Sequence, residues 1–243
     1  MKPSKQDFFN QYRQNTIIEV VQAIAKSRAG SQIAFKGGTA LKLFYGPPRY
    51  SEDIDYDSLP GVSAQELMKI LKDLFAKRRW EITDEAIKYF TILLELRFAG
   101  PERHFRVKVE ISTREKELET TIQYFRGVPI LTLEPSFLMT EKLLTFIDRQ
   151  AGRDIFDAWF IIDHGYPLKD SLIKRTFNDC PDFYQAMLSI VEKTDTKKLL
   201  RDTGKLLGED YRNWIKTSFL SDFSRLLRDR MDSLTSSWDP RSS

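Results

Sequence analysis

The sequence predicts an α+β protein with a sheet-containing domain over residues 1–133 and a helical domain over residues 134–243. Residues 53–57, 90–98 and 105–112 largely alternate between polar and apolar side chains, with the period of two that is typical of strands. Past Glu134 and Pro135 this alternation stops and helical spacing dominates. These observations together favour strands and helices in the first part and helices alone in the second.

The first domain opens with helical spacing. Ser4 can cap a first helix whose apolar positions run from residue 8 to residue 24. An apolar stretch at 33–35 then leads into Gly37-Gly38, and residues 39–45 form a short helix that ends at Gly46-Pro47-Pro48.

The later elements follow from the same patterns. Residues 64–79 place Leu67, Leu71 and other apolar side chains on one helical face. The two strands at 90–98 and 105–112 flank Gly100-Pro101, so we expect a hairpin. Residues 137–162 are helical, with an interruption near Gly152.

Composition excludes several classes of protein. The net charge of +3 permits a nucleic-acid partner without requiring one. One cysteine, Cys180, excludes an internal disulfide framework. Two histidines leave little material for a zinc site or a Ser-His-Asp triad. The N-terminal region lacks the apolar core of an export signal, and no apolar run approaches about 20 residues, so we expect a soluble cytoplasmic protein without a membrane partner.

Two carboxylates define the candidate site. Asp53 and Asp55 alternate with Ile54 and Tyr56, so a strand places both acids on one face. Two neighbouring carboxylates repel each other unless a cation lies between them. Oxygen ligands of this kind suit Mg²⁺, with Mn²⁺ as the alternative.

A third carboxylate is available on a later strand. In the sequence RVKVEI, Glu110 lies on the polar face together with Lys108, opposite the apolar face of Val107 and Val109. If this strand pairs with residues 53–57, Glu110 can complete a three-carboxylate site for two metal ions.

A double glycine provides a candidate phosphate site. Gly37-Gly38 lies where a strand is expected to meet a helix, and backbone N–H groups at a helix N-terminus favour anions. Lys36, Arg49 and Ser51 are candidate side-chain supports for the phosphates. A double glycine alone is more often only a turn, but the order of these motifs in one short segment favours a nucleotide site.

Together these residues resemble the polymerase-beta-like nucleotidyltransferase superfamily, whose signature is a double glycine, an Asp-x-Asp strand and a later acidic strand residue. The longer string GGTAL…YG…RxSxDID resembles the AbiEii/AbiGii branch. So does a second pattern formed by Lys142-Leu143, Arg149, Arg153-Asp154 and Asp157. The resemblance covers residues from about 33 to 163. It implies a mixed-sheet nucleotidyltransferase domain followed by a helical domain that contributes substrate-binding residues.

The resemblance also implies roles. Asp53 and Asp55 would bind metal, and Glu110 would position or deprotonate the acceptor hydroxyl. Ser51 and the Gly37-Gly38 backbone would hold the NTP phosphates. In the second domain, the residues assigned to catalysis or nucleotide binding are Lys142, Arg153 and Asp157. Lys142 would neutralise the leaving pyrophosphate.

The separations between Lys142, Arg149, Arg153 and Asp157 are seven, four and four residues, which would align them on one face of an unbroken helix. The alternative is an ordinary solvated face with an Arg153–Asp157 pair.

The function implied is that of a bacterial toxin from a toxin–antitoxin or abortive-infection system. It would transfer a nucleoside monophosphate from an NTP to RNA, with the 3′ end of tRNA as the expected acceptor, and a cognate antitoxin would control it. Transfer to a small molecule or a protein hydroxyl is the nearest alternative. A nucleotide-binding module without catalysis is the non-enzyme alternative.

Overall fold

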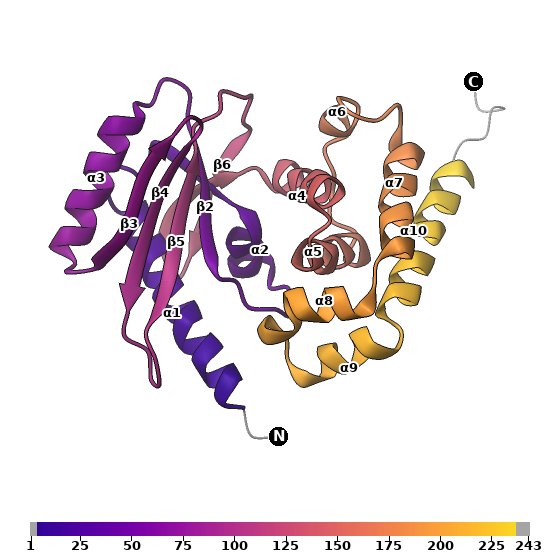
Figure 1. The fold of residues 1–243 in the computed structure, drawn as a ribbon. Helices are drawn as coiled ribbons and strands as arrows, with labels where there is room; N and C mark the ends of the chain where they lie inside the picture. The colour runs from indigo at the N-terminus through magenta and orange to yellow at the C-terminus, as the bar shows by residue number, and fades with distance from the viewer. Residues whose placement is uncertain (1–3, 237–243) are drawn as a thin grey trace. The chain divides into compact units, whose positions relative to one another are not determined.

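The computed structural model describes residues 4–236 and contains two compact units, one ending at Glu134 and the other beginning at Pro135 (Figure 1). The first unit combines a sheet with three helices, and the second is helical. The predicted α+β class is confirmed.

The sheet of the first unit has seven strands in the order β3-β4-β5-β2-β1-β7-β6. Two neighbouring pairs, β2/β5 and β1/β7, run parallel, and the other pairs run antiparallel, so the sheet is mixed. The strands are β1 (Ile33–Lys36), β2 (Asp53–Ser58), β3 (Glu81–Lys88), β4 (Thr91–Phe98), β5 (Phe105–Ser112), β6 (Thr120–Phe125) and β7 (Val128–Leu133).

The three helices of this unit are α1 (Lys5–Ala25), α2 (Gly37–Tyr45) and α3 (Ala64–Lys77). Ser4 begins α1 with a capping box, in which its hydroxyl accepts from the Asp7 N–H and the Asp7 carboxylate accepts from the Ser4 N–H. The rings of Phe9 and Tyr12 lie 5.8 and 6.0 Å from the ring of Phe105. Helix α1 therefore packs on the sheet face that carries Phe105, which is the apolar face of β5.

The chain contains three strands, β3, β6 and β7, where the sequence predicts no element. Strands β3 and β6 are the two edges of the sheet, and β3 exposes most of its side chains. An exposed edge strand has no buried face that would impose a clear apolar alternation. The β4/β5 hairpin around Gly100 is confirmed, with Phe98 opposite Phe105.

The second unit is built from α4 (Pro135–Arg149), α5 (Gly152–Asp163), α6 (Asp170–Ile173), α7 (Cys180–Lys193), α8 (Thr196–Thr203), a 3₁₀ turn (Gly204–Leu206), α9 (Glu209–Thr217) and α10 (Phe219–Ser236). Its core includes aromatic contacts: the Trp159 ring lies 4.8 Å from Trp214, and Phe156 stacks on Phe219 at 5.8 Å. Among the helices described for both units, none is long and apolar enough to cross a membrane.

The interruption predicted near Gly152 is a true break between α4 and α5. Gln150 has a positive φ of 51°, and the N-cap residue Ala151 offers no side-chain acceptor. The Gly152 N–H instead donates to Asp202 Oδ2 of α8 at 3.2 Å. A Cβ at Gly152 would lie 2.8 Å from the Asp202 Cβ, so glycine lets the two helices approach closely.

Asp222 gives the second unit an acid-sensitive contact. Its carboxylate accepts hydrogen bonds from Trp214 Nε1 and Ser218 Oγ, each at 2.8 Å, and these bonds lower the pKa of Asp222 below its ordinary value of 3.8. A lowered pKa stabilises the fold above the unfolded-state value, and this contribution is lost as pH falls through the folded-state value.

We therefore expect Asp222→Asn to melt at a lower temperature than the parent at neutral pH and to lose less stability on acidification below about pH 4. Melting followed by tryptophan fluorescence across pH measures both effects. Parallel pH profiles for the two proteins would contradict this assignment.

Candidate active site

Strand β2 has one buried apolar face and one face that carries the two aspartates, as the sequence predicts. Ile54 and Tyr56 are buried, whereas Asp53 and Asp55 are partly exposed on the opposite face. Burial, and secondarily the Asp55 charge, raise the pKa of the Tyr56 phenol. Tyr56 therefore stays neutral and belongs to the core, and the two aspartates belong to the site.

Strand β5 lies directly beside β2, as the three-carboxylate hypothesis requires. The parallel register pairs Asp53 with Lys108 and Asp55 with Glu110. Lys108 forms a salt bridge with Glu110, and this hydrogen bond, aided by the charges of Asp53 and Asp55, raises the pKa of Lys108. The Lys108 ammonium is thus a cation already held beside these carboxylates.

A preformed metal cluster is absent from the residues that the structure describes: no three His, Cys, Asp or Glu side chains lie in a ligating group. Glu110 is turned towards Lys108. The donor chemistry nevertheless fits a hard cation, because Asp53, Asp55 and Glu110 supply only carboxylate oxygens and exceed the positive charge of Lys108.

The double glycine packs directly against this site. Gly37 has a φ of 75°, and a Cβ there would lie 2.3 Å from Asp55 Oδ2. A Cβ at Gly38 would lie 2.5 Å from Arg49 Nη2 and 3.5 Å from Ser51 Oγ. The fold therefore brings together five of the residues that the sequence marks.

Arg49 and Ser51 are buried side chains that hydrogen bonds hold in place. Arg49 is 3% exposed, and its Nη1 donates to the Tyr50 carbonyl at 2.9 Å. The Thr39 hydroxyl lies 2.7 Å from Ser51 Oγ and also contacts the Asp53 carbonyl. Thr39 links the glycine turn to the start of β2, a role that the sequence did not assign to it.

The start of α2 offers backbone donors. Lys36 is the N-cap residue of α2, and its side chain accepts no hydrogen bond from the first N–H groups of the helix. The Lys36 ammonium instead lies 2.6 Å from the buried carboxylate of Asp57, which Lys116 also approaches at 3.0 Å. The charge of Lys36 is thus already matched by Asp57.

In the helical unit, Lys142 lies between two buried acids. Its ammonium forms a salt bridge with Asp154 and lies 3.0 Å from Asp157, whose side chain has no exposed surface. Lys142, Arg149, Arg153 and Asp157 would share one face only on an unbroken helix, and this condition is not met, because α4 ends at Arg149 and α5 begins at Gly152 as the expected interruption requires. Lys142 and Asp157 meet across two helices, and Arg153 is exposed at the start of α5.

The family comparison covers most of the chain. The model of the nucleotidyl transferase AbiEii toxin, a type IV toxin–antitoxin system, matches residues 19–232. The chain belongs to the AbiEii nucleotidyltransferase toxin family. The AbiEii match extends the resemblance seen in residues 33–163 in both directions.

Two solved structures share the fold of this AbiEii chain. JHP933 from Helicobacter pylori is 19% identical, with 97% of each chain covered and a TM-score of 0.58. A second H. pylori structure, provisionally assigned as a nucleotidyltransferase, is 20% identical, with 96% of this chain and 99% of the other covered and a TM-score of 0.58. No curated protein shows significant sequence similarity to the chain.

In this AbiEii chain, we expect Lys142→Met to lower the free energy of unfolding by about 3–5 kcal/mol, because it removes a cation that pairs with two buried carboxylates. Thermal and denaturant unfolding measure the change. Lys174→Met is the matched control, since Lys174 pairs with Asp170 on the exposed surface of the same unit and its removal should have little effect. Equal effects of the two substitutions would contradict the buried cluster.

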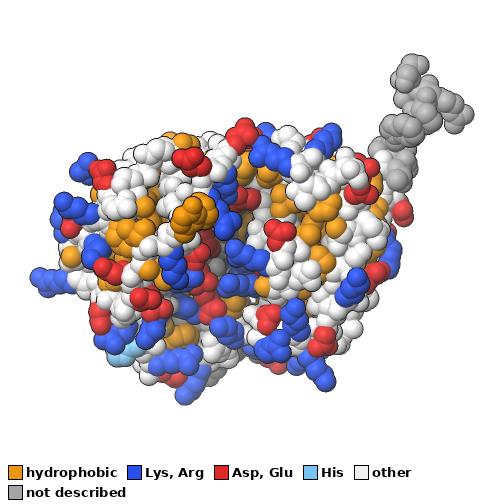
Figure 2. Space-filling view, turned by 45° about the horizontal axis from the view of Figure 1, so that its top comes forward, with side chains coloured by type: hydrophobic (Ala, Val, Ile, Leu, Met, Phe, Trp, Pro, Cys, Tyr) orange, Lys and Arg blue, Asp and Glu red, His pale blue; other side chains and the backbone are white. Residues whose placement is uncertain are grey.

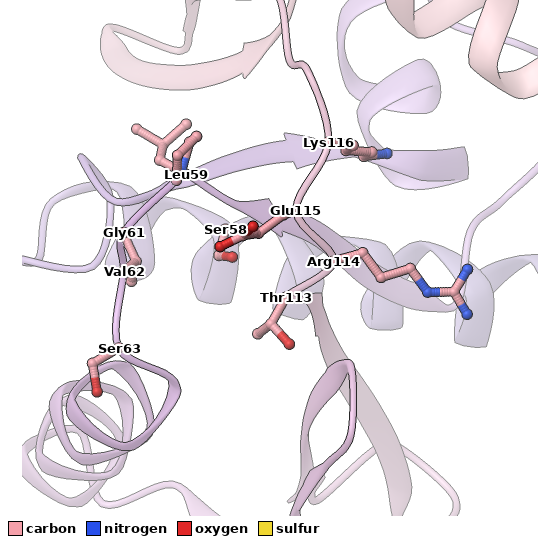
Figure 3. Close-up of a pocket in the computed structure, with 10 residues that line it drawn as sticks. Ser58, Leu59, Gly61, Val62, Ser63, Thr113, Arg114, Glu115 and Lys116 are labelled. Atoms are coloured by element: carbon pink, nitrogen blue, oxygen red, sulfur yellow. The ribbon is translucent and has the colours of Figure 1, made fainter.

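A pocket of about 260 Å³ lies elsewhere in the sheet unit of the AbiEii chain (Figure 3). It is formed by the connection 58–63 and by the segment 113–116, which follows β5. Because β2 and β5 are parallel, this pocket lies at their carboxyl ends, whereas Asp53 begins β2. None of Asp53, Asp55 and Glu110 lines the pocket, so the candidate active site is a different part of the sheet.

Proposed function

We propose that this AbiEii nucleotidyltransferase transfers a nucleoside monophosphate from an NTP to an acceptor hydroxyl in a metal-dependent reaction on the open face of β2 and β5. One observation carries the proposal: Gly37 packs against Asp55, and Gly38 packs against Arg49 and Ser51. A turn that favours phosphate thus adjoins a carboxylate that favours a cation.

The proposed metal is Mg²⁺, with Mn²⁺ as the alternative. Asp53 and Asp55 would hold it, and Glu110 would join them when it is released from Lys108. When bound, the metal would lower the charge on the phosphates and favour the ionised acceptor hydroxyl.

The phosphates would lie on the N–H groups of Gly37 and Gly38, with Ser51 and Arg49 beside them. Lys36 enters the proposal through its backbone, as the residue that begins α2, because its ammonium faces Asp57. Attack by the acceptor oxygen on the α-phosphorus forms one P–O bond and breaks the bond to the β-phosphate oxygen. Pyrophosphate leaves, and Glu110 would accept the hydroxyl proton.

In the helical unit, Lys142 would bind the triphosphate in exchange for part of its pairing with Asp154 and Asp157, and Arg153 would be a second cationic group. Asp154 and Asp157 would hold the Lys142 ammonium in position, which gives Asp157 a defined role. An ammonium fixed in this way loses less conformational freedom when it binds an anion than a mobile surface lysine does.

The proposed acceptor is RNA, at the 3′ end of tRNA, and the proposed protein partner is a cognate antitoxin. The partner follows from the type IV toxin–antitoxin family. Basic and acidic side chains are interspersed on the face drawn in Figure 2, so the choice of RNA depends on the family resemblance more than on charge. A tRNA acceptor would place the reaction in the cytoplasm.

The decisive experiment incubates the protein with Mg²⁺, total cellular RNA and each of the four α-labelled NTPs in turn. We expect label in a tRNA-sized band, and we expect Asp55→Asn to abolish it. Label in the protein itself would show that the acceptor is a protein hydroxyl and not RNA. Binding of NTP without transfer to RNA, protein or a small-molecule extract would show that the protein is a nucleotide-binding module and not an enzyme.

A further inference from the structure

Helix α1 buries polar side chains on a surface where apolar ones would be expected. It packs on the apolar sheet face, and Ile17, Val21 and Ile24 are fully buried there. Gln14 is only 7% exposed and Asn10 only 4%. A buried amide is unfavourable unless it forms hydrogen bonds, so these residues need a specific reason to be there.

Gln14 contacts the segment that carries Ser51. Its Oε1 accepts from the Ser51 N–H at 3.3 Å, and Ser51 is itself buried. The buried Gln14 Nε2 has no hydrogen-bond partner among the described residues, so the amide is held by this one contact. Gln14 therefore fixes the backbone position of Ser51, which also contacts Thr39.

Arg13 contacts β5 and the residue that precedes β2. Its Nη1 pairs with Glu52, the residue before Asp53, and its Nη2 donates to the Arg106 carbonyl at 3.2 Å. The Arg13 and Glu52 side chains are only 17% and 16% exposed. One guanidinium thus joins the beginnings of β2 and β5, close to the register pair of Asp53 and Lys108.

We propose that Arg13 and Gln14 are positioning residues of the candidate active site, acting from the opposite face of the sheet. Gln14 holds Ser51 for the NTP phosphates, and Arg13 holds β2 and β5 in the alignment that brings Asp55 beside Glu110. This inference rests on the proposed nucleotidyl transfer. Both residues precede the range 19–232 that the family model matches.

The two residues act on different parts of the site, so their substitutions should have different kinetic signatures. Gln14→Met removes the acceptor for Ser51, and we expect about a tenfold higher KM for NTP with kcat little changed. Arg13→Met releases the two strands, and we expect kcat to fall by about ten- to hundredfold. Arg13→Lys keeps the charge opposite Glu52 and should recover part of the loss.

Gln11→Met is the matched control, because Gln11 is an exposed glutamine on the same helix. It should leave KM, kcat and the melting temperature unchanged. Equal changes in kcat and KM for Gln14→Met and Arg13→Met, accompanied only by lower melting temperatures, would overturn the proposal in favour of simple structural support.

A second measurement does not depend on activity. We expect Gln14→Met to accelerate amide hydrogen exchange at Ser51 by at least about fivefold in the NTP-free protein, with no change for Gln11→Met. Unchanged exchange at Ser51 would overturn the positioning role even in an active enzyme. Accelerated exchange in a protein whose parent transfers no nucleotide would support the contact and reject the proposed function.

Discussion

Asp55→Asn is expected to reduce nucleotidyl transfer by about a thousandfold or more while leaving the fold intact. The asparagine side chain would match the size of the aspartate but would bring no negative charge to the proposed metal site. The packing against Gly37 would remain. Removing one of several neighbouring carboxylates also relieves repulsion, so we expect an unchanged or slightly higher melting temperature.

The measurements are kcat/KM with saturating Mg²⁺ and the melting temperature of both proteins. Asp84→Asn is the control, because Asp84 is an exposed acid on the edge strand β3 of the same sheet. An Asp55→Asn protein that kept more than about a tenth of the parent activity would exclude the carboxylate from the reaction centre.

Gly37→Ala is expected to abolish activity through a steric effect on the same carboxylate. A φ of 75° disfavours alanine by about 1–2 kcal/mol, and the new methyl carbon would lie 2.3 Å from Asp55 Oδ2. Either Asp55 or the glycine turn must move, and both belong to the proposed phosphate and metal site. A shift of about 1 Å is enough to reduce catalysis by about a hundredfold.

Gly46→Ala separates backbone strain from the clash. Gly46 ends α2 with a φ of 77°, yet a Cβ there would have no atom within 4 Å. We expect both variants to lose stability from backbone strain, Gly37→Ala more because of its clash with Asp55, and only Gly37→Ala to lose transfer. Similar activities in the two variants would show that the contact between Gly37 and Asp55 is not needed.

Sequence alone predicted the faces of the central strands because their periodicity is strong. The alternation through residues 53–57 and 105–112 placed Asp53, Asp55 and Glu110 opposite the apolar side chains, and the burial of Ile54 and Val109 agrees with it. The pairing of β2 with β5 could only be stated as a condition, since strand neighbours are set by tertiary packing.

Other features leave no local signal in a single sequence. Lys108 alternates like an ordinary exposed residue, and only the register reveals that it lies beside Asp53 and binds Glu110. Gln14 reads as one more polar position in α1 until its burial is known. Gly152 indicated an interruption of the helical segment, but the sequence could not show that Lys142 and Asp157 meet across the two helices on either side of it.

The contact between Gly152 and Asp202 spans fifty positions of the chain, and this separation orders events during synthesis. A ribosome adds Lys142, Asp154 and Asp157 well before it adds Asp202, whose carboxylate accepts the hydrogen bond from the Gly152 N–H at the start of α5. A nascent chain that stops short of Asp202 already carries the three charged groups, but the first amide of α5 then lacks its tertiary acceptor. The hydrogen bond that completes the start of α5 therefore forms only after residue 202 has been added, later than the residues of the lysine cluster.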